Sequence, residues 1–471
     1  MSEPIIIQGG MGAAVSNWRL ARAVSKKGLL GVVSGTAIEG VMALRLQSGD
    51  PEGHMRRALE HFPFPEIAAR ILARYYIAGG KKADQSFSTI PMFKLNPDQA
   101  LIELTVAANF VEVFLAKEGH HGLVGINYLE KIQLPILPSL YGAMLAGVDY
   151  VLMGAGIPRF IPGTLDKLSL HETVSLKVNV EGASSEDNFE ITFDPLTINP
   201  QAQEPLNRPK FLAIVSSSVL AVTLSKKSNG RVDGFVIEAP TAGGHNAPPR
   251  GALKLDERGE PIYGSRDIVD LDDVRKLGLP FWLAGSFASP ERLKYALKQG
   301  ASGIQVGTVF AFCRESGIED ELKERIIRKA LVGDLRVFTD PLASPTGFPF
   351  KVVELEDSMS EKVVAENRPR VCDLGYLRTA YKKEDGSVGC RCPGEPVDIY
   401  LRKGGKIEDT AGKKCLCNAM VANIGLPQVR KSGYVEPVLV TSGNDILQIA
   451  SYVKDGETSY SAAAVIDHLL S

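Results

Sequence analysis

The residues Gly243, Gly244 and His245 are the part of the chain whose types and spacing most directly suggest chemistry. They end the run EAPTAGGH, directly after a short apolar strand candidate at Gly234–Ile237. Two glycines in a row leave a backbone without side chains, so a large anionic ligand can approach it closely. The imidazole beside them can move a proton near neutral pH. An ordinary glycine-rich turn with a surface histidine is the alternative interpretation.

Three further strand candidates end in glycine-rich loops. In a parallel barrel the strand ends share one face, and phosphate commonly binds after strands seven and eight. A single glycine cluster is also typical of a plain turn, so the prediction depends on the joint placement of these loops on separate strands. The loops are Gln8-Gly9-Gly10-Met11-Gly12 after the first strand, Ala284-Gly285-Ser286 after the seventh and Gln305-Val306-Gly307-Thr308 after the eighth.

Cysteine is the second residue type that could do chemistry. Five of the six cysteines fall between residues 372 and 417, and they include two Cys-x-Cys pairs. Groups of four thiolates suit tetrahedral zinc or an iron–sulfur cluster. Reduced structural thiols in a loop-rich segment are the alternative, and redox-linked disulfides are less expected in a cytosolic chain. The candidate metal ligands are Cys372, Cys390, Cys392, Cys415 and Cys417.

The elements that must position these residues alternate along the first 310 residues. Short runs rich in Val, Ile and Leu, without polar alternation, are typical of parallel strands that are covered on their outer face. Amphipathic stretches separate them, as in successive βα units. Eight such units predict an α/β fold with a closed (β/α)8 TIM barrel. The strand candidates are Ile5–Gln8, Leu29–Ser34, Leu123–Asn127, Tyr150–Gly154, Phe211–Ser216, Gly234–Glu238, Phe281–Ala284 and Gly303–Gly307.

Two excursions interrupt this alternation, and a third region follows it. The segment 36–122 is largely helical in character, whereas residues 165–209 contain a period-two alternation that predicts an antiparallel β-hairpin. We therefore predict a barrel over residues 1–340 with these two insertions. The extension over residues 341–471 would contain the cysteine cluster.

Two of the intervening helices have recognisable ends. We expect Ser16 to cap a helix that contains Trp18 and ends at Gly28. Ser289-Pro290 is expected to begin another helix, which ends at Gly300.

The composition excludes several classes of protein. The chain has 471 residues, of which 44% are hydrophobic and 23% charged, with a net charge of -2. These values describe a soluble globular protein and give no reason to expect nucleic-acid binding. The first residues lack a basic segment followed by a long apolar one, and uninterrupted apolar runs of about 18 residues are missing. We expect a cytoplasmic protein that does not enter a membrane.

A Rossmann dinucleotide site is an alternative for the first glycine-rich loop. Gly10-Met11-Gly12 follows a strand and precedes a helix, but Val15 stands where the third glycine of that fingerprint belongs. The second strand candidate also lacks an acidic residue at its end. The pattern therefore disfavours this interpretation.

Several of these motifs together resemble the nitronate monooxygenase family, formerly called 2-nitropropane dioxygenases. The resemblance is carried by IIIQGGMG, VGIN at Val124–Asn127, AGGH at Ala242–His245, LAGSFAS and GASGIQVGT, within residues 1–350. The related FMN-dependent enoyl-acyl-carrier-protein reductases have the same motifs. They include the trans-acting enoyl reductases of polyunsaturated fatty acid and polyketide synthases. The resemblance implies FMN at the mouth of a (β/α)8 barrel.

The resemblance also implies a role for each matching position. Gly9, Gly10 and Met11 would present backbone atoms to the isoalloxazine ring, and Asn127 would reach the flavin from the third strand. His245 matches the catalytic histidine, and an imidazole suits proton movement at a substrate carbon near neutral pH. The remaining cofactor-binding residues would be Gly243, Gly244, Gly285, Ser286, Gln305, Gly307 and Thr308.

The chain departs from the simpler family pattern directly after His245. The run Asn246-Ala247-Pro248-Pro249-Arg250-Gly251 stiffens the loop with two prolines and adds a cation. Arg250 either recognises a carboxylate or phosphate of the substrate or braces the loop through an acidic partner. This departure puts small neutral nitroalkanes in doubt as the substrate.

The expected activity is FMN-dependent oxidation of an alkyl nitronate by dioxygen. The alternative within the enzyme class is reduction of an enoyl thioester with NAD(P)H, serving a fatty acid or polyketide synthase. A hypothesis from another class is a flavin-binding scaffold or partner subunit of a biosynthetic complex, in which His245 is dispensable. A phosphate-sugar isomerase would use the phosphate loops without a flavin.

Overall fold

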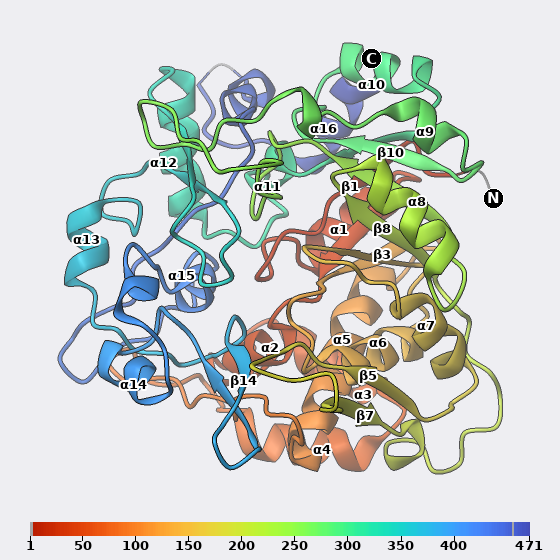
Figure 1. The fold of residues 1–471 in the computed structure, drawn as a ribbon, viewed down its shortest axis with the longest axis vertical. Coiled ribbons are helices and arrows are strands. Elements are labelled where there is room, and N and C mark those ends of the chain that lie inside the picture. Colours follow the sequence, from red (N-terminus) through yellow and green to blue (C-terminus); the bar gives the residue numbers. More distant parts are fainter. Residues whose placement is uncertain (1–2, 455) are drawn as a thin grey trace.

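Eight parallel strands close into a barrel in this computed structural model, which describes residues 3–454 and 456–471 (Figure 1). Their order around the barrel is β1-β11-β10-β9-β8-β4-β3-β2. The predicted (β/α)8 barrel is therefore confirmed. The strands are β1 (Ile6–Gln8), β2 (Leu30–Ser34), β3 (Val124–Leu129), β4 (Tyr150–Gly154), β8 (Lys210–Val215), β9 (Gly234–Glu238), β10 (Phe281–Ala284) and β11 (Gly303–Val306).

The apolar runs of the sequence account for these strands because each strand is buried on both faces. Alternate residues point into the barrel or out toward the helices, as at Val32 and Val33 or at Val151 and Leu152. The interior holds its own apolar cluster, which fills the barrel below the mouth. The cluster consists of Ile7, Leu30, Val32, Tyr150, Leu152, Leu212, Val236, Trp282 and Ala284.

Helices cover the outer face of the barrel. The predicted cap at Ser289 is confirmed, because its side chain accepts a hydrogen bond from the Arg292 N–H. The predicted cap at Ser16 is wrong, because Asn17 accepts from the Leu20 N–H and caps this helix instead. The helices are α1 (Trp18–Ser25), α6 (Ile136–Leu145), α7 (Ile161–Ser169), α8 (Ser218–Lys227), α9 (Leu271–Arg275), α10 (Pro290–Lys298) and α11 (Thr308–Ala311).

The insertion between β2 and β3 is helical, as predicted. It contains α2 (Ile38–Gln47), α3 (His54–Glu60), α4 (Pro65–Tyr75) and α5 (Gln99–Lys117). Among the described residues, α5 is the one helix that is long and apolar enough to cross a membrane by length and composition. It packs against α1, α2 and α6, and 72% of its apolar window is buried. Its apolar character is accounted for by its place in the core.

The insertion between β4 and β8 contains the predicted antiparallel pair. Strands β5 (Val174–Lys177) and β7 (Glu190–Phe193) pair in antiparallel register, and a 3-10 turn, η1 (Pro195–Thr197), follows. Between them, β6 (Val180–Glu181) pairs with β14 (Thr379–Lys382) of the C-terminal region. This pairing connects the insertion to the extension.

The C-terminal third of the chain, teal to blue in Figure 1, lies along one side of the barrel, and its last helix returns to α1 and α10. It shares one continuous apolar core with the barrel. The predicted division near residue 340 stays a prediction. Its elements are α12 (Asp320–Leu331), β12 (Val337–Asp340), β13 (Phe350–Val353), α13 (Lys362–Asn367), β14, β15 (Val388–Arg391), α14 (Val397–Arg402), η3 (Ile407–Thr410), α15 (Leu416–Ala422), η4 (Ile446–Tyr452) and α16 (Ala462–Leu469). In the barrel, a further 3-10 helix, η2 (Ser265–Asp267), precedes α9.

Candidate active site

A cavity of about 260 Å³ opens at the carboxyl ends of the barrel strands. A water molecule needs only about 10–15 Å³ of such space, so there is room for a much larger ligand. The cofactor residues predicted from sequence all line this cavity together with His245, although their roles stay predictions. They are Gly9, Gly10, Met11, Asn127, Gly243, Gly244, Gly285, Ser286, Gln305, Gly307 and Thr308.

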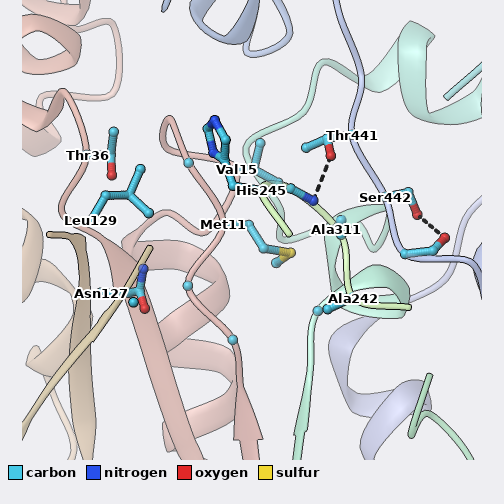
Figure 2. A pocket seen from close by; sticks show the side chains of 18 of the residues that line it. Met11, Val15, Thr36, Asn127, Leu129, Ala242, His245, Ala311, Thr441 and Ser442 are labelled. Carbon is cyan, nitrogen blue, oxygen red and sulfur yellow. Dashed lines mark hydrogen bonds between the residues drawn. The ribbon is translucent and has the colours of Figure 1, made fainter. Parts of the chain in front are cut away.

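Figure 2 shows how side chains from distant parts of the chain surround this cavity. Asn127 and Leu129 enter from one side and Thr441 and Ser442 from the other, with Met11 between them. The strand ends provide the first group, whereas the C-terminal extension provides the second.

The first glycine-rich loop lies close to neighbouring strands because it has no side chains. A Cβ atom on Gly10 would lie 2.3 Å from the Asn127 Cβ, and one on Gly9 would lie 3.3 Å from Gln305 Cγ. Ser16 fixes the loop from behind, since its hydroxyl donates to the Gly9 carbonyl and accepts from the Met11 N–H, both at 3.0 Å. The glycines therefore allow Asn127 and Gln305 to line the cavity beside the loop.

The loops after β10 and β11 also expose backbone to the cavity. Gly285 and Ser286 both have positive φ values, +94° and 57°. This conformation is rare for serine and marks a specialised loop. The N–H groups of Ser286 and Gly307 have no acceptor within the described part of the chain. Such groups are available to a ligand.

His245 is held by a serine that the sequence analysis missed. Its Nε2 lies 2.7 Å from the Ser344 hydroxyl, whose oxygen lies 2.8 Å from the Thr346 hydroxyl. The Phe350 ring contacts the imidazole edge to face, with centroids 4.8 Å apart. No described residue bonds Nδ1, so a proton on Nε2 leaves Nδ1 as the free basic nitrogen.

The environment of His245 favours the neutral imidazole. Burial, together with the nearby charge of Lys131, lowers the pKa of His245 to about 4. Lys131 is held over the Phe348 ring and donates to the Thr346 carbonyl at 3.2 Å. At neutral pH His245 can therefore accept a proton, as a general base must.

Glu238 is a second titratable group of the cavity that the sequence analysis did not select. It ends β9 and lines both the main cavity and a smaller pocket beside it. Burial raises the pKa of Glu238 to about 7. In the sequence, Glu238 is simply the acidic residue that ends an apolar run. Its half-buried position at the end of a barrel strand became apparent only in the structure.

The C-terminal extension forms one wall of the cavity, which the sequence analysis did not predict. Tyr376, Cys417 and Met420 line it from the region around α15. A separate loop, Thr441–Asp445, contributes Thr441, Ser442, Gly443 and Asp445. In the sequence TSGND has the composition of any surface turn, so its position could not be inferred.

The metal site predicted for the five clustered cysteines stays a prediction. Among the described residues, no group of three or more His, Cys, Asp or Glu side chains is arranged to hold a metal ion, and the cysteines are free thiols. Burial raises the pKa of Cys372, Cys390, Cys392, Cys415 and Cys417. The charges of Cys372, Cys392 and Cys415 also raise the pKa of Cys417, so these thiols lie near one another in the fold.

Arg250 contacts the loop itself. Its backbone N–H donates to the Asp267 carboxylate at 2.8 Å, and its guanidinium lies 3.5 Å from the Ser216 carbonyl. It lines the smaller pocket and is absent from the residues that line the main cavity. Among the described residues the guanidinium has no acidic partner, so the role of the Arg250 side chain stays a prediction.

The residues of the main cavity fit an FMN molecule. Gln305 Oε1 is buried and has no hydrogen-bond partner among the described residues, so it can accept from a ring N–H. Free backbone N–H groups and the Ser286 hydroxyl can donate to a phosphate. Met11, Leu129 and Phe350 contribute apolar surface to the same cavity.

Comparisons with known proteins support this interpretation of the barrel. The family model of nitronate monooxygenase matches residues 180–343, which contain His245 and the loops after β10 and β11. A probable nitronate monooxygenase of Bacillus subtilis is 31% identical over 114 residues, 24% of this chain and 31% of that protein. The nitronate monooxygenase of Pseudomonas aeruginosa is 34% identical over 94 residues, 20% of this chain and 25% of that protein. The barrel is thus similar to nitronate monooxygenases over its second half.

A third relative acts on a different kind of molecule. The (3aS,4S,5R,7aS)-5-hydroxy-7a-methyl-1-oxo-octahydro-1H-indene-4-carboxyl-CoA dehydrogenase of Mycobacterium tuberculosis is 25% identical over 245 residues, 49% of this chain and 64% of that protein. The matches therefore span less than two thirds of each of these relatives. Among solved structures, FabK from Thermotoga maritima aligns over 100% of this chain and 92% of its own, with a TM-score of 0.49 and 15% identity.

Proposed function

We propose that the protein is an FMN-dependent oxidoreductase that oxidises alkyl nitronates with dioxygen. The observation that carries this proposal is the convergence of four glycine-rich strand ends and His245 on one cavity. The family match over residues 180–343 supports the reaction class. The cavity residues would hold the flavin, which supplies the electron-transfer chemistry when bound.

His245 is the proton acceptor in this proposal. Its pKa, lowered to about 4, keeps the imidazole neutral at physiological pH. Ser344 bonds Nε2 and leaves Nδ1 to take a proton from the carbon next to the nitro group of a nitroalkane, or to orient a nitronate already deprotonated. The apolar residues around the cavity restrict water access and favour an organic substrate.

The absorption spectrum of freshly purified protein tests the cofactor assignment. We expect flavin bands in the visible region and release of FMN on denaturation. Metal analysis of the same sample tests the zinc or iron–sulfur prediction. A colourless protein that takes up no FMN would overturn the proposal and favour a phosphate-sugar isomerase.

Reduction of an enoyl thioester with NAD(P)H is the second candidate. It is favoured by the relative whose name specifies a carboxyl-CoA substrate. Anaerobic mixing distinguishes the two activities. Fast bleaching of the flavin band by NADPH would support the reductase, whereas slow bleaching by NADPH with fast reduction by a nitronate would support the monooxygenase.

The partner-subunit hypothesis makes a different prediction for His245. Replacement of His245 by alanine should abolish turnover if the protein is an enzyme of either kind. Undiminished turnover on every tested substrate would favour a scaffold in a biosynthetic complex. We also propose that the protein is cytoplasmic and acts on small molecules.

A further inference from the structure

The loop Thr441–Asp445 of the C-terminal extension lies against two of the glycine-rich strand ends. The Gly443 N–H donates to the Thr308 hydroxyl at 3.1 Å, and the Gly244 N–H donates to the Thr441 hydroxyl at 2.9 Å. A third bond joins the Asn444 N–H to the Thr241 carbonyl at 3.0 Å. Figure 2 shows Thr441 and its hydrogen bond at the edge of the cavity. The loop is thus tied to the ends of both β9 and β11.

We propose that the loop Thr441–Asp445 completes the phosphate-binding end of the flavin site. This inference rests on the proposed FMN dependence. It adds to that proposal a part of the chain outside residues 180–343, where the family model matches. Four residues of the loop line the same cavity as Gly307 and Thr308.

The backbone of the loop approaches the strand-end loops too closely to allow side chains. A Cβ atom on Gly243 would lie 2.8 Å from the Gly443 nitrogen. A Cβ atom on Gly443 would lie 2.7 Å from Asp445 Oδ1 and 2.8 Å from Thr308 Oγ1. Both positions therefore favour glycine, because a side chain at either one would force the loop away from the strand ends.

Two hydroxyl groups lie at this contact. Thr308 and Thr441 each accept a backbone N–H from the protein. The Thr308 hydroxyl also interacts with the Asp445 carboxyl, whereas the hydrogen of the Thr441 hydroxyl stays available for a ligand. Phosphate oxygens are strong hydrogen-bond acceptors. Since none of the described residues lining the cavity is Lys or Arg, neutral N–H and hydroxyl groups must bind the phosphate.

Asp445 belongs to the same loop and lines the cavity. Its Oδ1 is buried and has no hydrogen-bond partner within the described residues. Burial raises the pKa of Asp445. The carboxyl can donate to a phosphate oxygen only in its protonated form.

A comparison of FMN with riboflavin tests the proposal, because the two ligands differ only in the phosphate. Dissociation constants are measured by equilibrium dialysis on the full-length chain after removal of bound flavin. The variant Thr441→Val keeps the shape of the side chain and removes the hydroxyl. We expect its affinity for FMN to fall about tenfold while its affinity for riboflavin stays within twofold of wild type. Thr223→Val, on α8 and remote from the cavity, is the matched control and should bind both flavins as wild type does.

Gly443→Val provides a second, steric test. The valine side chain would contact Thr308 and Asp445. We therefore expect this variant to lose more FMN affinity than Thr441→Val does, while its binding of riboflavin is retained. Thermal unfolding shows whether the variant folds. Equal losses for the two flavins, or no loss for either in Thr441→Val, would overturn the assignment of the loop to the phosphate. A wild-type chain that binds neither flavin would overturn the proposed function and this inference with it.

Discussion

His245 owes its availability as a base to Ser344. Nε2 lies 2.7 Å from a hydroxyl that is fully buried and also bonded to Thr346, so the ring has one fixed partner and one free nitrogen. The interaction resembles the way in which other catalytic histidines are oriented by a second group on the far side of the ring. Ser344 is thus a positioning residue, because it acts on the substrate only through His245.

Ser344→Ala removes this partner and should reduce kcat/KM about tenfold. A neutral hydrogen bond contributes about 1 kcal/mol, and its loss also releases the ring from one tautomer. The measurement is steady-state turnover from about pH 3 to 9, where we expect a shift of the acid limb near pH 4 as well as a lower plateau. Ser451→Ala, which removes an exposed hydroxyl on η4, is the control. An unchanged profile in Ser344→Ala would show that His245 needs no such support.

Glu238 makes the stability of the fold depend on pH. An unperturbed glutamate has a pKa of 4.5, and the folded protein raises this pKa to about 7. Between these values the folded state binds a proton that the unfolded state has released, so the free energy of unfolding falls as pH rises. The stabilisation is complete below about pH 4.5 and is lost as pH rises through 7.

Glu238→Gln should remove this dependence, because the amide has similar size and does not ionise. Between pH 5 and pH 8, the free energy of unfolding of the wild type should fall by about 2 kcal/mol more than that of the variant. This value is reduced because Glu238 is partly exposed. Urea unfolding at both pH values measures the difference. Glu257→Gln, at an exposed position, should show no such gain. Parallel pH dependences for wild type and Glu238→Gln would mean that the carboxyl ionises freely in the fold.

The strands of the barrel were predictable from the sequence, whereas the wall formed by the extension was not. Strands β4, β9 and β10 have the predicted bounds, and the other five differ by one or two residues at one or both ends. Continuous apolar runs report burial on both faces, which is a local property of the chain. The approach of Gly443 to Gly243 is a contact between loops 200 residues apart, and no local pattern encodes it.

The cysteines illustrate the same limit at the level of elements. Their spacing predicts a metal site, and β15 and the start of α15 place the thiols in a buried environment where the thiolate is disfavoured as long as no metal is bound. Burial raises the pKa of Cys415 to about 11 and that of Cys392 to about 12. Sequence spacing specifies which residues can meet, whereas the protonation state depends on packing.

These pKa values predict slow alkylation of the clustered thiols in the folded protein. We expect iodoacetamide at pH 8 to leave Cys392 and Cys415 largely unmodified in the native state, because the thiolate is the reactive species. After denaturation in the presence of a chelator, all six cysteines should react at comparable rates. Mass spectrometry of the labelled peptides measures both conditions. Rapid native labelling of Cys415 would contradict the buried, protonated thiol.

At the scale of the whole molecule, the lysines and arginines lie away from the lining of the cavity. The chain carries a net charge of -2, and the cavity-lining residues that the structure describes include neither Lys nor Arg. Lys131 and Lys413 lie behind the wall, where they donate to the carbonyls of Thr346 and Ser344. A phosphate in this cavity would therefore be held by hydrogen bonds from hydroxyl and N–H groups.

Binding by hydrogen bonds without nearby cations predicts a weak dependence of FMN affinity on salt. Salt screens the attraction between exposed charges, with a Debye length that falls from about 10 Å at 0.1 M to about 3 Å at 1 M, and it affects neutral donors much less. We expect the dissociation constant of FMN to change less than about twofold between 0.05 M and 0.5 M sodium chloride. The riboflavin dissociation constant over the same range corrects for effects of salt on ring binding. A tenfold weakening confined to FMN would mean that a lysine or arginine reaches the phosphate, and the cavity would then have to rearrange when the cofactor binds.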